Sequence, residues 1–66
     1  MTKTEYEEEI IKLMKMYYRN EEKARAWYKK PNRLIYGYNR PFTPEQLVND
    51  GQGALVIRFI KLFIGG

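Results

Sequence analysis

The sequence lacks cysteine and histidine altogether. Without cysteine the chain has no disulfide and no thiolate metal site, and nothing points to an oxidising compartment. Without histidine it lacks the commonest zinc ligand and the commonest general base. Enzymatic chemistry is therefore a poor expectation, and we predict no catalytic residue, no bound metal and no cofactor.

Long hydrophobic runs are also missing. The longest, ALVIRFIKLFI, covers eleven residues from Ala54 to Ile64 and includes Arg58 and Lys61, whereas a membrane-spanning helix needs about 20 mostly apolar residues. The first residues, MTKTEYEEE, are acidic and unlike a secretory signal. We expect a cytoplasmic protein without membrane contact.

The 66 residues of the chain support one domain, residues 1–66, because so short a chain buries only about 60% of its unfolded surface.

Charge is present in both signs but unevenly distributed. Twelve Lys and Arg against eight Asp and Glu give a net charge of +4. Between Arg19 and Arg40, seven basic residues stand against two acidic ones. Such a basic block favours an acidic partner, either a phosphate backbone or an acidic protein face. Half of the acids lie near the N-terminus, at Glu5, Glu7, Glu8 and Glu9.

Two helices are predicted in the N-terminal half. Thr4 and Glu7 have the spacing of a capping box, and the apolar residues behind them recur at steps of three and four, which predicts a helix over residues 5–18. Asn20 is suited to cap a second helix that Pro31 ends. The apolar positions are Tyr6, Ile10, Leu13, Met14 and Tyr17 in the first helix and Ala24, Ala26 and Trp27 in the second.

An irregular link and a short helix are predicted next. Residues 33–42, RLIYGYNRPF, contain too many helix breakers for a regular element, and we expect a loop held by Leu34. Thr43 as cap and Pro44 at the first helical position specify a helix of two turns. Gly51 and Gly53 end that helix and open the next element.

The apolar segment Ala54 to Ile64 is short enough to be a buried strand, but no second strand candidate is present to pair with it, so a helix is favoured. Its apolar residues spread nearly all round such a helix. It either completes the core or forms a partner or homodimer interface. The expected fold class is therefore all-α, a small single-domain bundle of about four short helices.

The middle of the chain, ARAWYKKPNRLIYG, combines basic and aromatic residues. Interleaved cations and rings are suited to tracking a phosphate backbone and stacking on bases, with Tyr28, Tyr36 and Tyr38 as candidates. The plainer interpretation places Trp27 in the core and the charges on a solvated face, and we favour it.

The order of several residues matches a known pattern: Ala24-x-x-Trp27, Pro31-Asn32, Leu34, Gly37, Thr43-Pro44-x-x-Leu47-Val48, Gly51, Gly53, Val56 and Gly65. Over residues 21–65 the chain thus resembles the toxin-binding, C-terminal domain of the Xre/MbcA/ParS antitoxins. The resemblance implies a small helical module that binds and blocks a RES-type toxin, an enzyme that consumes or transfers from NAD. It also implies mainly structural roles for Trp27, Pro31, Asn32, Leu34, Thr43, Pro44, Leu47 and Gly51.

This sequence departs from the family pattern in two ways. Family members usually carry a DNA-binding helical region ahead of the domain, whereas here only the helix of residues 5–18 precedes it, so we expect a stand-alone toxin-binding module. The link IYGYNRPF is also longer and more aromatic than the family's connection.

The function expected from the sequence is that of a protein-binding inhibitor, an antitoxin-like module that occludes the active site of a toxin enzyme. The alternatives are a small basic nucleic-acid-binding protein and a module that self-associates through Ala54–Ile64. The residues expected to bind the partner are Lys29, Lys30, Arg33, Tyr36, Tyr38, Arg40, Arg58 and Lys61.

Overall fold

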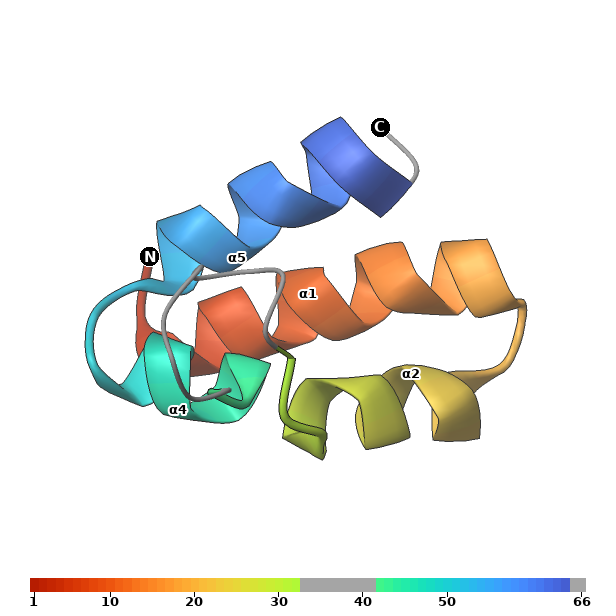
Figure 1. Ribbon diagram of the computed structural model, residues 1–66, viewed down its shortest axis with the longest axis horizontal. Helices are drawn as coiled ribbons and strands as arrows, with labels where there is room; N and C mark the ends of the chain where they lie inside the picture. The colour runs from red at the N-terminus through yellow and green to blue at the C-terminus, as the bar shows by residue number, and fades with distance from the viewer. Residues whose placement is uncertain (33–41, 65–66) are drawn as a thin grey trace.

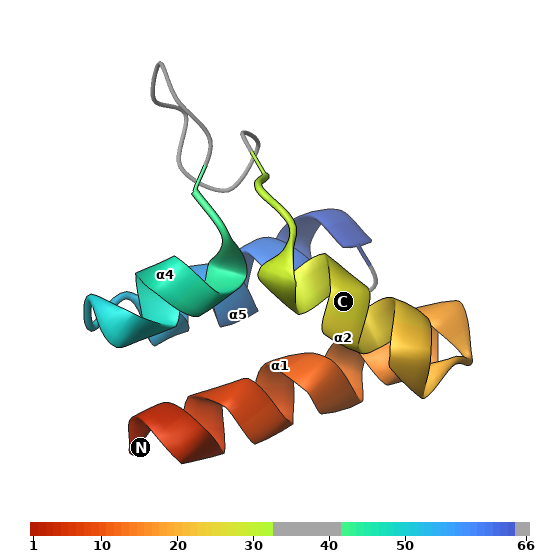
Figure 2. The same ribbon diagram turned by 90° about the horizontal axis from the view of Figure 1, so that it is seen from below.

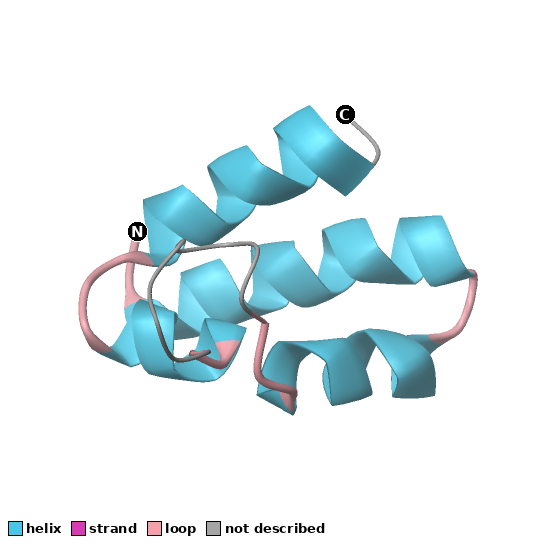
Figure 3. Cartoon of the chain, viewed as in Figure 1, coloured by secondary structure: helices cyan, strands magenta, loops and turns pink. Residues whose placement is uncertain are grey.

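The computed structural model of the chain describes residues 1–32 and 42–64, apart from the side chain of Phe63. These residues form helices and no strand, which confirms the predicted all-α bundle (Figures 1 and 3). The helices are α1 (Lys3–Tyr18), α2 (Glu21–Lys29), α4 (Pro44–Asn49) and α5 (Gly53–Phe59), and α5 continues directly into the π-helix η1 (Ile60–Ile64).

Helix α1 begins two residues earlier than predicted, because a different threonine caps it. The hydroxyl of Thr2 accepts a hydrogen bond from the backbone N–H of Glu5 at 3.1 Å. The Glu5 carboxylate accepts one from the backbone N–H of Thr2 at 2.8 Å. Thr2 and Glu5 have the same spacing as Thr4 and Glu7, and starting at Thr2 adds two more helical residues.

The caps of α2 and α4 are those that the sequence predicts. The side chain of Asn20 accepts a hydrogen bond from the Lys23 N–H at 3.0 Å, and α2 ends just before Pro31. Thr43 and Gln46 form a capping box with two bonds of 2.9 Å, and Pro44 is the first residue of α4. After α4 the chain turns at Gly51, whose φ of 82° is readily adopted only by glycine.

Helix α1 lies at the centre of the arrangement and contacts all the other described elements. In Figure 1, α2 returns antiparallel along one side of α1, while α5 and η1 run along the other side. The core is therefore built from side chains of every described element: Ile10, Ile11, Met14, Ala24, Tyr28, Leu47, Val48, Val56, Phe59 and Ile60.

The aromatic side chain that α2 places in the core is Tyr28 rather than Trp27. Tyr28 is 2% exposed, whereas Trp27 is only partly buried against the edge of the core and Ala26 is exposed. Residues four apart share a face of a helix, so the fully buried Ala24 brings Tyr28 inward with it. The predicted apolar face of α2 was thus wrong by one position.

The ends of the link between α2 and α4 are joined by a backbone hydrogen bond. The N–H of Asn32 donates to the carbonyl of Phe42 at 2.8 Å, forming an isolated antiparallel bridge. Figure 2 shows the two chain segments leaving α2 and α4 side by side on the face opposite α1. The predicted loop itself, with Leu34 and Gly37, lies outside the described residues.

The apolar segment near the C-terminus is helical, as predicted. It buries Val56, Phe59 and Ile60 against the other helices and leaves Leu62 exposed. The side chain of Phe63 in this segment lies outside the described part of the structure. No helix within the described ranges has both the length and the hydropathy needed to cross a bilayer.

Candidate partner-binding groove

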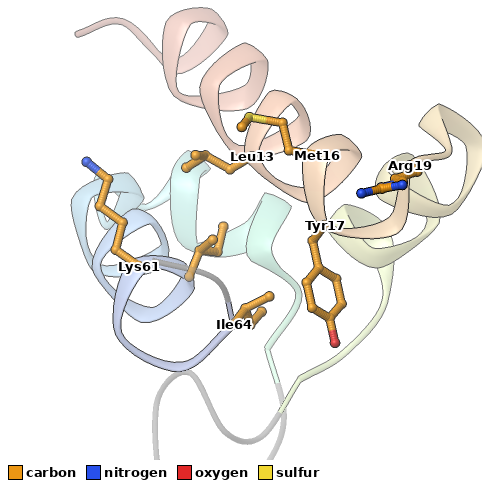
Figure 4. A pocket seen from close by; sticks show the side chains of 7 residues that line it. Leu13, Met16, Tyr17, Arg19, Lys61 and Ile64 are labelled. Atoms are coloured by element: carbon orange, nitrogen blue, oxygen red, sulfur yellow. The ribbon is translucent and has the colours of Figure 1, made fainter.

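An apolar groove of about 360 Å³ lies between the C-terminal end of α1 and η1 (Figure 4). Apart from two cations, the described residues that line it are apolar or aromatic, and none of them is acidic. The α1 side is formed by Leu13, Met16, Tyr17 and Arg19, and the η1 side by Ile60, Lys61 and Ile64.

The apolar wall on α1 follows from three consecutive large residues at the end of that helix. Successive residues are turned by about 100° around a helix, so Met16, Tyr17 and Tyr18 cannot all lie on its buried face. Met16 is 68% exposed and Tyr17 57% exposed. The rings of Tyr17 and Tyr18 pack edge to face with centroids 5.1 Å apart, which orients them both. In η1, Leu62 does not line the groove and is 64% exposed.

Arg19 adopts a backbone conformation that is unfavourable for its residue type. It is the C-cap of α1, with φ 56° and ψ 35°, and its N–H donates to the carbonyl of Lys15 at 2.7 Å. This left-handed conformation is common for glycine at helix ends but costs other residues about 1 kcal/mol. Among the described residues Arg19 is the only non-glycine with a positive φ.

The other wall of the groove also has unusual backbone geometry. Residues Ile60–Ile64 form a π-helix, a rare structure that recurs at functional sites. This segment supplies Lys61 and Ile64 to the groove. Both walls therefore have backbone conformations that local sequence preferences do not favour. The α1 wall also carries the exposed apolar side chains of Met16 and Tyr17.

The charges that the described residues bring to the groove are all positive, and none of them is paired within that part of the chain. Within residues 1–32 and 42–64, both side-chain ion pairs are made by Glu21, which lies 3.5 Å from the Lys15 Nζ and 3.3 Å from the Arg25 Nε. Arg25, and to a lesser extent Lys15, lower the pKa of the Glu21 carboxyl. Within these ranges Arg19 and Lys61 make no such pair, so their charges are open to an anionic group from outside.

Among the described residues that were predicted to bind a partner, Lys61 alone lines this groove. Lys29 and Lys30 are exposed at the end of α2, and Arg58 is exposed on α5 away from the groove. The remaining predicted contacts, Arg33, Tyr36, Tyr38 and Arg40, lie outside the described residues.

Tyr28 is not available as a base-stacking side chain, because its ring is buried. Burial, reinforced by the carboxylates of Glu7 and Glu45, raises the pKa of its hydroxyl to about 12. The phenol is therefore protonated at neutral pH and does not accept a proton as a general base. No three acidic side chains of the described ranges gather as they would around a metal ion.

Sequence reasoning missed the groove because it assigned Leu13 and Tyr17 to the buried face of α1 and gave Met16 and Arg19 no role. The signal that was present is the run Met16-Tyr17-Tyr18 at the end of the helix. Three adjacent large side chains exceed what one helix face can bury, so part of the run must be exposed.

Comparisons with protein-family models, curated proteins and solved structures found no match to this chain. The likeness to the antitoxin domain rests on the residues quoted above.

Proposed function

We propose that this chain is a protein-binding inhibitor that neutralises an enzyme by covering its active site. The proposal rests on the exposure of Met16, Tyr17 and Leu62 on the two elements that form the groove. A 66-residue chain needs most of its apolar side chains for its own core. Large apolar side chains gathered on the surface of so small a domain indicate a contact that a second protein completes.

The proposed target is a toxin enzyme of the RES type. This choice is supported by the ordered pattern of residues from Ala24 to Gly65, which resembles the toxin-binding domain of the Xre/MbcA/ParS antitoxins. A small helical module inhibits such an enzyme by exclusion of the substrate and needs no catalytic group of its own.

The proposed interface is larger than the groove alone. A stable contact buries about 800 Å² on each protein, which is roughly one sixth of the 4868 Å² surface of this chain. The groove then serves as the apolar centre of the contact. The exposed cations Lys29, Lys30 and Arg58 are available to enlarge it.

The direct test is affinity capture with the tagged chain from a nuclease-treated lysate of the source cells, followed by mass spectrometry and an assay of the captured material. We expect a stoichiometric RES-type enzyme that does not consume NAD in the complex and regains this activity on release. Capture of no such enzyme, or of one that remains active in the complex, contradicts the proposal.

Nucleic-acid binding is the second candidate function, favoured by the exposed Lys29 and Lys30 beside the Asn32–Phe42 bridge. Several phosphate contacts would make the affinity fall by orders of magnitude between low and moderate salt. A contact centred on apolar side chains loses much less. Salt titration of the captured complex therefore separates the two functions.

Self-association through Ala54–Ile64 has less surface available than the sequence suggests. Val56, Phe59 and Ile60 of this segment are buried within the same chain. The apolar surface left for a second copy is that of Ala54 and Leu62 and parts of Leu55, Ile57 and Ile64. Sedimentation equilibrium tests this function, and a monomer at high concentration excludes it.

A further inference from the structure

We propose that the groove between α1 and η1 binds an acidic segment of the partner enzyme, one that carries an apolar anchor with carboxylates on both sides. The inference rests on the proposed function and adds to it the chemistry of the bound segment. In Figure 4, Arg19 and Lys61 lie at opposite ends of the groove, and Leu13, Met16 and Ile64 lie between them. The anchor fills the apolar centre, and the carboxylates reach the two cations.

Charge complementarity supports an acidic occupant. The lining contains Arg19 and Lys61 and no acid, and neither cation is paired within the described part of the chain. A basic or neutral segment would leave both charges without a partner, whereas carboxylates give two charge-assisted contacts. A nucleic-acid phosphate would satisfy the cations too, but its backbone has no apolar group to fill the space beside Met16.

A second copy of this chain fits the groove poorly. A symmetric contact of groove against groove would bring Arg19 and Lys61 of one copy towards the same cations of the other, and each copy carries a net charge of +4. The acids Glu8 and Glu9 belong to the N-terminal half of α1, whereas the groove lies at its C-terminal end. A copy that offered these acids would bind head to tail, which gives a ring or an open chain rather than a two-fold dimer.

The backbone at the groove supplies an independent argument. The only non-glycine with positive φ in the described residues, Arg19, lies on one wall, and the π-helix Ile60–Ile64 lies on the other. Folding alone favours glycine at position 19 and a regular α-helix in place of η1. Locally unfavourable backbone on both sides of one groove indicates a binding role, because such conformations concentrate at functional sites.

The probe for this groove is a short synthetic peptide in which a central Leu-Leu pair is flanked on each side by glutamates. Glutamine-flanked and lysine-flanked versions serve as matched controls. We would titrate each into the ¹⁵N-labelled chain and follow the backbone amide signals. The glutamate peptide should shift the amides of residues 13–19 and 60–64, and the glutamine peptide should bind about tenfold more weakly because it loses both charge contacts.

Variants assign the contacts within the groove. Arg19→Gln and Lys61→Gln should each weaken the glutamate peptide about two- to fivefold, and Met16→Ser about tenfold. Arg19→Lys should retain most of the affinity. Lys3→Gln, which removes the same charge at the far end of α1, should leave it unchanged. Far-ultraviolet circular dichroism verifies that each variant is folded.

Several outcomes would overturn the proposal: no shift of the groove amides, equal binding of all three peptides, or a dimer that Met16→Ser abolishes. The same variants separate this inference from the proposed function. If the Met16→Ser and Lys61→Gln variants inhibit the captured enzyme as strongly as the native chain does, the groove assignment fails while the inhibitor function stands. If the peptide binds as described but no enzyme is inhibited, the function fails while the groove remains a site for acidic segments.

Discussion

Gly53 at the start of α5 lies directly on the ring of Tyr6 in α1. A Cβ atom at position 53 would be only 2.5 Å from the Cγ of Tyr6, which is closer than carbon atoms approach in proteins. The absence of a side chain at Gly53 therefore sets how near α5 comes to α1.

Gly53→Ala should lower the free energy of unfolding by about 1–2 kcal/mol, because the added methyl group must displace the Tyr6 ring. Urea denaturation of the purified chain measures this change. In a double-mutant cycle with Tyr6→Ala, the cost of Gly53→Ala should largely disappear, since the clashing ring is gone. A cost that is the same in both backgrounds would show that the strain has another origin.

Thr2→Ala and Thr4→Ala should change stability in opposite directions. Thr2 caps α1, so its loss should lower the free energy of unfolding by about 1 kcal/mol. Thr4 is exposed within the helix, where alanine is the better helix former, so Thr4→Ala should raise it by about 0.5 kcal/mol. Urea denaturation of both variants measures the difference. If Thr4→Ala instead lowered the free energy of unfolding more than Thr2→Ala does, Thr4 would be the cap, as the sequence first predicted.

Arg19→Gly should raise the free energy of unfolding by about 1 kcal/mol, since glycine adopts the left-handed conformation of this position without steric cost. Thermal and urea unfolding measure this gain, and Arg19→Ala serves as the control that should give none. The same Arg19→Gly variant should bind the glutamate-flanked peptide more weakly. Equal stability of the glycine and alanine variants would contradict the strain assigned to Arg19.

Tyr28 should make stability fall at high pH. Its pKa is raised in the folded state from 10.0 to about 12, so the unfolded chain releases this proton first as the pH rises. The contribution of the Tyr28 hydroxyl to the free energy of unfolding is therefore fully present below pH 10. It is lost as the pH rises from 10.0 towards about 12. Tyr28→Phe retains the buried ring and should remove this part of the pH dependence.

The measurement is urea denaturation of the native chain and of Tyr28→Phe at a series of pH values from neutral to alkaline. Other groups that ionise at high pH are common to both proteins, so the difference between the two curves isolates Tyr28. Parallel curves throughout that range would show that the hydroxyl is not buried in the folded state.

Short-range signals determined the helices. Asn20, Thr43 and Pro44 act within a single turn of their own helices, and Pro31 and Gly51 stop helices through their own backbone preferences. Such signals do not depend on the rest of the fold, so the sequence predicts the all-α class and most helix ends correctly. The start of α1 escaped prediction because two threonines stand in equivalent positions, and the choice between them depends on how much helix each one adds.

Tertiary packing determined which side chains of each helix are buried and which are exposed. The sequence alone favoured a helix for ALVIRFIKLFI, but it did not show that Val56, Phe59 and Ile60 would be covered while Leu62 stayed exposed. It also did not show that Tyr28 rather than Trp27 would enter the core, or that the ends of α1 and η1 would enclose a groove. These outcomes depend on contacts between residues far apart in the chain, such as Tyr6 with Gly53, which no local pattern encodes.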